Sequence, residues 1–235
     1  MKKNLCAICA YHDITKLNLG NINKYIGGIT QNIQLINNNY CKSDFLKEII
    51  DQYGVYPGVV FDEFNAQSYY CDVVNDDSEY IYNFHYRRCL DLPKNFTLQP
   101  KTIICNGTQR GYTIQRLYKD FVIEPSFIKK HPDIMKQIYF IYSEIFNMLY
   151  EDVENIFKYS MFMGREMYIC HKDVHKDMVH KCYKFIKLVL EKIDLNLFNK
   201  KRAMGFMIEG FISFYIITKR NKEGYNIYYT PIKEL

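Results

Sequence analysis

The residues of this chain that are best suited to chemistry lie in the segment EYIYNFHYRRC, residues 79–89. Its apolar and aromatic first part predicts a strand over 79–86, which places His85, Arg87 and Arg88 at the strand's carboxyl end, where α/β sheets bind their ligands. Arginine forks match phosphate oxygens, so Arg87 and Arg88 could hold a diphosphate. Because strand side chains alternate, His85 and Arg87 should face the same side. The ordinary alternative is a solvated arginine pair beside a hydrogen-bonded histidine.

A second candidate is Glu209, a carboxylate within the most apolar late segment, residues 203–218. A carboxylate in such surroundings usually has a charged partner or a task. A salt bridge with Arg202 or Arg165 is the structural alternative to a functional role.

Three histidines, His171, His175 and His180, lie on a helix predicted near 172–192. The first two are four residues apart, a spacing that can bind zinc. The glutamate of an HExxH motif is absent, and lysines follow the histidines closely, a pattern typical of a solvated basic face. A zinc-dependent hydrolase therefore stays an alternative function. A basic face of this kind could also approach anionic lipid.

Length and composition predict one globular domain over 1–235, because 235 residues that are 48% hydrophobic can bury one sizeable core. The formal net charge of +5 is spread along the chain, which favours anionic ligands but not a nucleic-acid module. A basic module that binds nucleic acid or a lipid surface remains the alternative. The cysteines form no paired CxxC motifs, and the apolar run at the start is interrupted at His12 and Asp13, which together favour a cytoplasmic protein without a signal peptide.

The elements that must position these residues alternate between strands and helices, which predicts an α/β layer fold. Strands are predicted over 5–11, 79–86, 101–105 and 159–163. Helices are predicted over 62–74 with Asp62 as N-cap, over 133–150 after Pro132, and over 172–192 and 201–218. The last of these is shorter than the ~20 apolar residues of a membrane-spanning helix, and it contains Glu209.

The string FHYRR resembles the HYRR signature of a bacterial glycosyltransferase family found in capsular-polysaccharide, exopolysaccharide and O-antigen gene clusters. Four further stretches are similar to motifs of that family in the same order: Tyr11-His12, Glu63-Phe-Asn-Ala66 followed by Tyr69-Tyr70, Tyr159-Ser-Met-Phe-Met163, and Lys201-Arg-Ala-Met-Gly-Phe-Met-Ile-Glu209. The chain departs from the family where Asp13 replaces a lysine, Ser160 replaces an asparagine, and Gly210 replaces the arginine after the glutamate.

The resemblance implies a single-domain, GT-A-like and Rossmann-like mixed sheet flanked by helices, with further helices at the carboxyl end. It implies a donor half over about 1–110 and an acceptor half over about 111–235. The reaction it implies moves a sugar from a nucleotide-sugar, with a UDP-sugar first, to a glycan or lipid-linked glycan in surface polysaccharide synthesis. The expected place is the cytoplasm, with peripheral contact at the inner face of the membrane, and no nucleic-acid partner is expected.

Roles follow from the same resemblance. Tyr11 and His12 would cradle the base and ribose, Tyr86, Arg87 and Arg88 would bind the donor diphosphate, and His85 would contact the donor sugar or phosphate. The proton acceptor would be Glu209, with Asp62 as the second choice. No Asp-x-Asp metal motif occurs, which favours metal independence, with Mn²⁺ or Mg²⁺ left open as cofactors.

Overall fold

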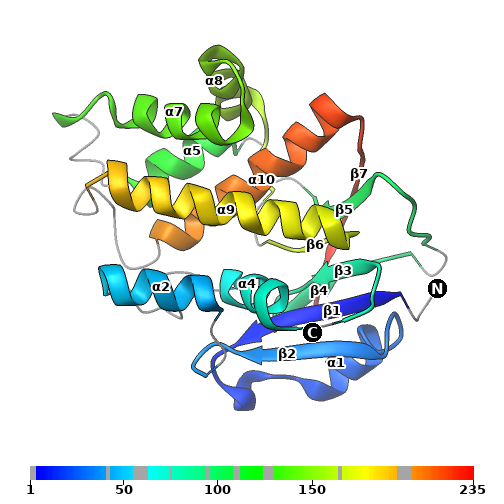
Figure 1. The fold of residues 1–235 in the computed structure, drawn as a ribbon. Helices are drawn as coiled ribbons and strands as arrows, with labels where there is room; N and C mark the ends of the chain where they lie inside the picture. The colour runs from blue at the N-terminus through cyan, green and yellow to red at the C-terminus, as the bar shows by residue number, and fades with distance from the viewer. Residues whose placement is uncertain are drawn as a thin grey trace.

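A six-stranded mixed sheet forms the centre of the computed structural model (Figure 1), which describes residues 4–40, 43–54, 63–74, 76–93, 96–107, 112–123, 130–163, 166–194 and 203–235. In spatial order its strands are β2 (Asn32–Asn37), β1 (Leu5–Tyr11), β3 (Tyr80–Asn83), β6 (Tyr168–His171), β5 (Thr102–Asn106) and β7 (Asn226–Thr230). All of these strands run in one direction except β6, which is antiparallel to both of its neighbours. We call the edge at which the five codirectional strands end the carboxyl edge.

Helices and a small ribbon surround this sheet. The helices are α1 (Leu19–Tyr25), α2 (Asp44–Tyr53), α4 (Phe64–Val73), α5 (Ile114–Leu117), α7 (Ile134–Phe146), α8 (Tyr150–Tyr159), α9 (Lys172–Lys192) and α10 (Ala203–Glu223), with a 3₁₀ turn η1 (Ile14–Lys16) and a π-helical turn η2 (Tyr118–Val122). The ribbon pairs β4 (Arg88–Leu90) with β8 (Ile232–Glu234). The predicted α/β class, with a mixed sheet flanked by helices and with closing helices, is confirmed, whereas the division near residue 110 stays a prediction.

The two faces of the sheet have separate cores, as side-chain alternation along β1 shows. Cys6 and Ile8 face the side that carries α4 and pack with Tyr70. Leu5, Ala7 and Cys9 face the other side. The larger core lies on the first side, where α4, α9 and α10 contact the sheet and α7 and α8 pack further out (Figure 1). The opposite face has a thinner cover, consisting of α1 and the β4–β8 ribbon.

The strand predicted over 5–11 is confirmed with its bounds, and the strand predicted over 101–105 is shifted by one residue. The strand predicted over 159–163 is wrong. Tyr159 is the last residue of α8, because Val153, Ile156 and Phe157 continue a helical spacing of buried side chains up to that point. Met161 makes only an isolated bridge with Thr113.

Among the helices, the one predicted over 172–192 is confirmed with its bounds. The helix predicted over 133–150 is two helices, because Asn147 adopts a left-handed backbone (φ 46°) that ends α7. Helix α4 begins at Phe64, and the predicted N-cap Asp62 lies outside the described residues. Helix α10 continues to Glu223. Within the described ranges, no helix has the length and apolar character needed to cross a membrane.

Candidate active site

Chain topology predicts a ligand site, called here the donor crevice, at the carboxyl ends of β1 and β3. The chain leaves β1 to form β2 on one side and later returns to form β3 on the other, so β1 is a topological switch point. Ligands of open α/β sheets bind outside the carboxyl ends of strands at such points. Tyr11 and His12 end β1, and residues 85–88 follow β3. Both of the predicted donor-binding groups therefore belong to this edge.

The HYRR residues form a tight turn and not a strand end. Strand β3 stops at Asn83, and the Arg88 amide donates to the His85 carbonyl oxygen at 2.9 Å. The prediction that His85 and Arg87 share a strand face is therefore wrong. The reversal is fixed by the histidine ring, since His85 Nδ1 accepts a hydrogen bond from the Arg87 amide at 3.1 Å. The sequence motif thus encodes a turn that starts the β4–β8 ribbon.

Glu63 contacts the other nitrogen of the same ring. His85 Nε2 lies 3.1 Å from Glu63 Oε1, and both side chains are largely buried. Because Nδ1 accepts from a backbone amide, Nε2 carries the ring proton and donates to the carboxylate. Glu63 reaches this place because α4 leads into β3, so the start of α4 lies at the carboxyl edge. The sequence offered Glu63 only as part of a motif and gave no sign of this pair.

The two arginines of the turn differ in their interactions with other side chains. Arg88 Nε lies 2.8 Å from Glu234 Oε1, and this ion pair joins β4 to β8. Arg87 is exposed, and its guanidinium lies 4.8 Å from the centre of the Tyr86 ring. Tyr86 in turn stacks on His85 with ring centres 4.4 Å apart. Arg87 makes no ion pair with any described residue, and it is the arginine better placed to receive an anionic ligand.

Buried asparagines support the end of β1. His12 is exposed, and its Nε2 lies 3.3 Å from Asn38 Nδ2. Asn38 Oδ1 accepts from Asn65 Nδ2 at 2.9 Å, and the Asn38 amide donates to the Tyr11 carbonyl oxygen at 2.8 Å. Asn38 and Asn65 are fully buried, so their polar groups fix the position of the crevice floor. Sequence reasoning missed both residues.

Glu166 is a second carboxylate that sequence reasoning missed. It is 4% exposed and has a left-handed backbone (φ 47°), a strained state for a residue with a side chain. Gln67 Nε2 donates to its carboxylate at 2.6 Å, and Asn83 Nδ2 donates to its carbonyl oxygen at 2.5 Å. Since β6 is antiparallel, its start lies at the carboxyl edge, which brings Glu166 beside the end of β3 and the start of α4. Strained residues of this kind concentrate at functional sites.

The histidines of α9 do not form a common site. His171 caps the helix by accepting from the Asp173 amide at 3.2 Å, whereas His175 is fully buried with its Nδ1 2.9 Å from the Tyr168 hydroxyl. No group of three or more histidine, cysteine, aspartate or glutamate side chains suited to a metal occurs in the described part of the chain. The solvated basic face predicted for this helix is therefore wrong at His175, and the zinc hypothesis has no support from the described geometry.

Burial of His175 makes the stability of the fold dependent on pH. Desolvation lowers the pKa of its imidazole to about 3, whereas an unfolded chain has the ordinary value of 6.5. Below pH 6.5 the His175 imidazole therefore binds a proton in the unfolded chain but stays neutral in the folded protein. As the pH falls from 6.5 to 3, we expect the free energy of unfolding to decrease by about 1.4 kcal/mol per pH unit because of this residue. Urea unfolding at several pH values measures the slope.

The control for this slope is His180, which is exposed on the same helix. His175→Gln retains a polar group for Tyr168 and should flatten the pH dependence, whereas His180→Gln should leave it as it is. Equal slopes in the wild type and in His175→Gln would show that the imidazole titrates normally in the folded state.

Glu209 lies in the first half of α10, and topology again fixes its place. Helix α10 leads into β7, which is parallel to β5, so α10 begins at the carboxyl edge and runs away from it. The Glu209 side chain is partly buried, and its carbonyl oxygen accepts from Ser213 Oγ at 2.9 Å. The proposed salt-bridge partners Arg202 and Arg165, and the alternative base Asp62, lie outside the described residues. The fold thus places Glu209 on the same edge as the HYRR turn.

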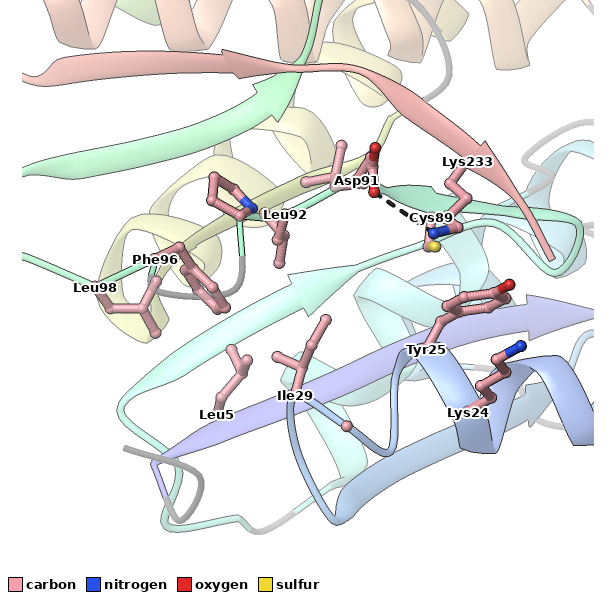
Figure 2. Close-up of a pocket in the computed structure, with 13 residues that line it drawn as sticks. Leu5, Lys24, Tyr25, Ile29, Cys89, Asp91, Leu92, Phe96, Leu98 and Lys233 are labelled. Carbon is pink, nitrogen blue, oxygen red and sulfur yellow. Dashed lines mark ion pairs between the residues drawn. The ribbon is translucent and has the colours of Figure 1, made fainter.

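A cavity of about 540 Å³ lies elsewhere, under the thinly covered face of the sheet (Figure 2). Leu5, Ile29 and Leu92 give it an apolar wall, and the Lys233–Asp91 ion pair of 3.7 Å lies at one end. The seven-residue helix α1 is too short to fill this side. None of the predicted site residues lines the cavity. The polar residues at the carboxyl edge, and not this cavity, are therefore the candidate active site.

Comparison with known proteins identifies the type of fold. The chain matches no family model and no curated protein. It is similar to a solved structure, the apo form of WbbM, a bifunctional glycosyltransferase, with a TM-score of 0.64 and 14% sequence identity. The match covers 98% of this chain and 46% of WbbM, so the chain spans less than half the length of that protein. The mixed α/β fold is thus one that occurs in a glycosyltransferase, in agreement with the architecture that the HYRR resemblance implies.

Proposed function

We propose that this protein is a glycosyltransferase that moves a sugar from a nucleotide-sugar to a glycan or lipid-linked glycan in surface polysaccharide synthesis. The observation that carries the proposal is the fold shared with WbbM over 98% of the chain. The HYRR turn at the switch point of the sheet adds a group suited to a diphosphate. A UDP-sugar is the first choice of donor, and a cytoplasmic location with contact at the inner membrane face belongs to the same proposal.

The reaction is a displacement at the anomeric carbon. The bond between this carbon and the diphosphate oxygen breaks, and its electron pair leaves with the nucleoside diphosphate. Arg87 stabilises the developing charge, with Arg88 beside it in the turn. The acceptor hydroxyl forms the new bond, and its proton passes to Glu209. Tyr11 and His12 hold the base and ribose.

In this proposal His85 does not contact the donor sugar or phosphate, the role that the sequence indicated. Both of its ring nitrogens are engaged, one with the Arg87 amide and one with Glu63. The residue therefore acts by holding the turn that carries Arg87, and contact with the donor is left to the exposed arginine and to Tyr86. In this mechanism arginine supplies positive charge for the leaving group, and Mn²⁺ or Mg²⁺ stays open as a cofactor.

A thermal-shift screen against nucleoside diphosphates tests this proposal. A ligand at 100 times its dissociation constant stabilises a protein by about 2.7 kcal/mol, and we expect such a shift with a uridine or similar nucleoside diphosphate. Each compound is measured with and without Mn²⁺ to resolve the metal question. If no common nucleoside diphosphate raises the melting temperature under either condition, the crevice is not a donor site.

A further inference from the structure

An exposed aromatic surface lies beyond the end of β5. We call Tyr112, Phe121 and Phe206 the aromatic platform. The centre of the Phe121 ring lies 6.1 Å from that of Tyr112 and 5.1 Å from that of Phe206. Phe121 is 44% exposed, and the neighbouring Met161 is 43% exposed. Tyr112 and Phe206 are partly exposed, so the three rings can present apolar faces to a ligand.

The platform depends on an unusual backbone. Phe121 belongs to the π-helical turn η2, which buries Tyr118 and Val122 and leaves Phe121 outside. Single π-helical turns are frequent at functional sites. Helix α10 is fixed closely against this turn, because a Cβ atom at Gly210 would lie only 2.9 Å from Tyr118 Cε2. Phe206, three residues before Glu209, thereby meets Phe121.

Polar groups form the rim of the platform. The Tyr112 hydroxyl donates to Asp120 Oδ2 at 2.9 Å, and Arg116 Nε lies 3.2 Å from the same oxygen. The Arg116 guanidinium lies 5.1 Å from the centre of the Tyr112 ring, and its side chain is 61% exposed. The surface thus combines ring faces with exposed donors and acceptors. This combination matches a pyranose, which has an apolar C–H face and a rim of hydroxyl groups.

The order of the strands relates the platform to the HYRR turn. Strand β5 is separated from β3 by the single strand β6, so their ends are about 10 Å apart at the usual strand spacing. Tyr112 follows β5 in the chain, and Phe121 contacts Phe206 in the first turn of α10, the helix that begins at the carboxyl edge. A sugar on the platform would therefore lie on the Glu209 side of the donor crevice.

We infer that the aromatic platform binds a saccharide ring of the acceptor and presents one of its hydroxyl groups toward Glu209. This inference rests on the proposed glycosyltransferase function and adds to it the place where a sugar ring of the acceptor binds. The ring stacks on Phe121 and Phe206, while Arg116 donates and Asp120 accepts hydrogen bonds at its edge.

Saturation-transfer NMR with a panel of disaccharides tests the inference. The panel contains galactose, glucose, mannose and N-acetylglucosamine units, and each sample contains a saturating nucleoside diphosphate. We expect signal on the ring C–H protons of at least one disaccharide, and about a fivefold or greater loss of affinity in Phe121→Ala and Phe206→Ala. Phe140→Ala is the control, since this residue is 61% exposed on α7 and lies outside the platform.

Each outcome has a definite meaning. An unchanged nucleoside diphosphate thermal shift in Phe121→Ala shows that the fold and donor site survive, and this variant decides the question if Phe206→Ala does not fold. A normal thermal shift without saturation transfer from any disaccharide would overturn the inference and leave the proposed function intact. Transfer that persists in both variants would also overturn it. A wild-type dimer that Phe121→Ala converts to a monomer in analytical ultracentrifugation would assign the platform to self-association instead.

Discussion

Glu209→Gln is expected to lower turnover by about 10²-fold or more while leaving the fold and the donor affinity unchanged. The substitution removes the group that accepts the acceptor's proton but retains the size and hydrogen-bonding reach of the side chain. Glu209 is a carboxylate in the first half of α10, the half that lies toward the carboxyl edge. It is on the side of the aromatic platform, because Phe206 lies three residues before it. Melting temperature, donor affinity and turnover should be measured on the same preparation.

The matched control is Glu223→Gln at the opposite end of α10, where the carboxylate pairs with Lys219 near the surface. This variant should turn over at the wild-type rate. A purely structural Glu209, bound in a salt bridge, predicts a different pattern: Glu209→Gln would be destabilised by an unpaired buried cation but normally active per folded molecule. That pattern would move the base to another carboxylate, with Asp62 next.

Arg87→Ala is expected to weaken binding of the donor and of the nucleoside diphosphate by about 1.5 to 3 kcal/mol, or roughly 10- to 150-fold. The guanidinium is exposed and has no ion pair with a described residue, so its removal costs a ligand contact and little stability. Calorimetric titration of the nucleoside diphosphate gives the affinity directly.

Arg88→Ala provides the comparison within the same turn. Arg88 is already paired with Glu234 across the β4–β8 ribbon, so its loss should destabilise that ribbon and reduce donor affinity less than the loss of Arg87. Wild-type affinity in Arg87→Ala would remove the arginine from the donor site. A larger effect at Arg88 than at Arg87 would mean that the ion pair opens when the ligand binds.

Local patterns in the sequence were sufficient for several elements. The bounds of β1 follow from its unbroken apolar run, and those of α9 follow from a helical spacing of buried side chains. The carboxyl-edge location of the HYRR residues also follows, because an apolar strand precedes them. The turn itself does not follow, since it depends on the contacts of His85 with Glu63 and with the Arg87 amide.

The missed site residues share one property, which is that their partners are distant in the chain. Gln67 and Glu166 are 99 residues apart, and Asn38 and Asn65 are 27 residues apart. Neither periodicity nor composition indicates such pairs, because a buried polar side chain looks the same in a sequence as a solvated one. The backbone strain at Glu166 is likewise set by tertiary contacts. The fold class could therefore be predicted, but the polar floor of the site could not.

The most direct test of the account is to incubate the protein with a set of nucleotide-sugars and the disaccharide panel, and to detect products by mass spectrometry. We expect that one nucleotide-sugar releases its nucleoside diphosphate, that a disaccharide gains the mass of one sugar residue, and that Glu209→Gln loses both signals. Absence of nucleoside diphosphate release from every nucleotide-sugar, with and without Mn²⁺, would contradict the assignment as a glycosyltransferase.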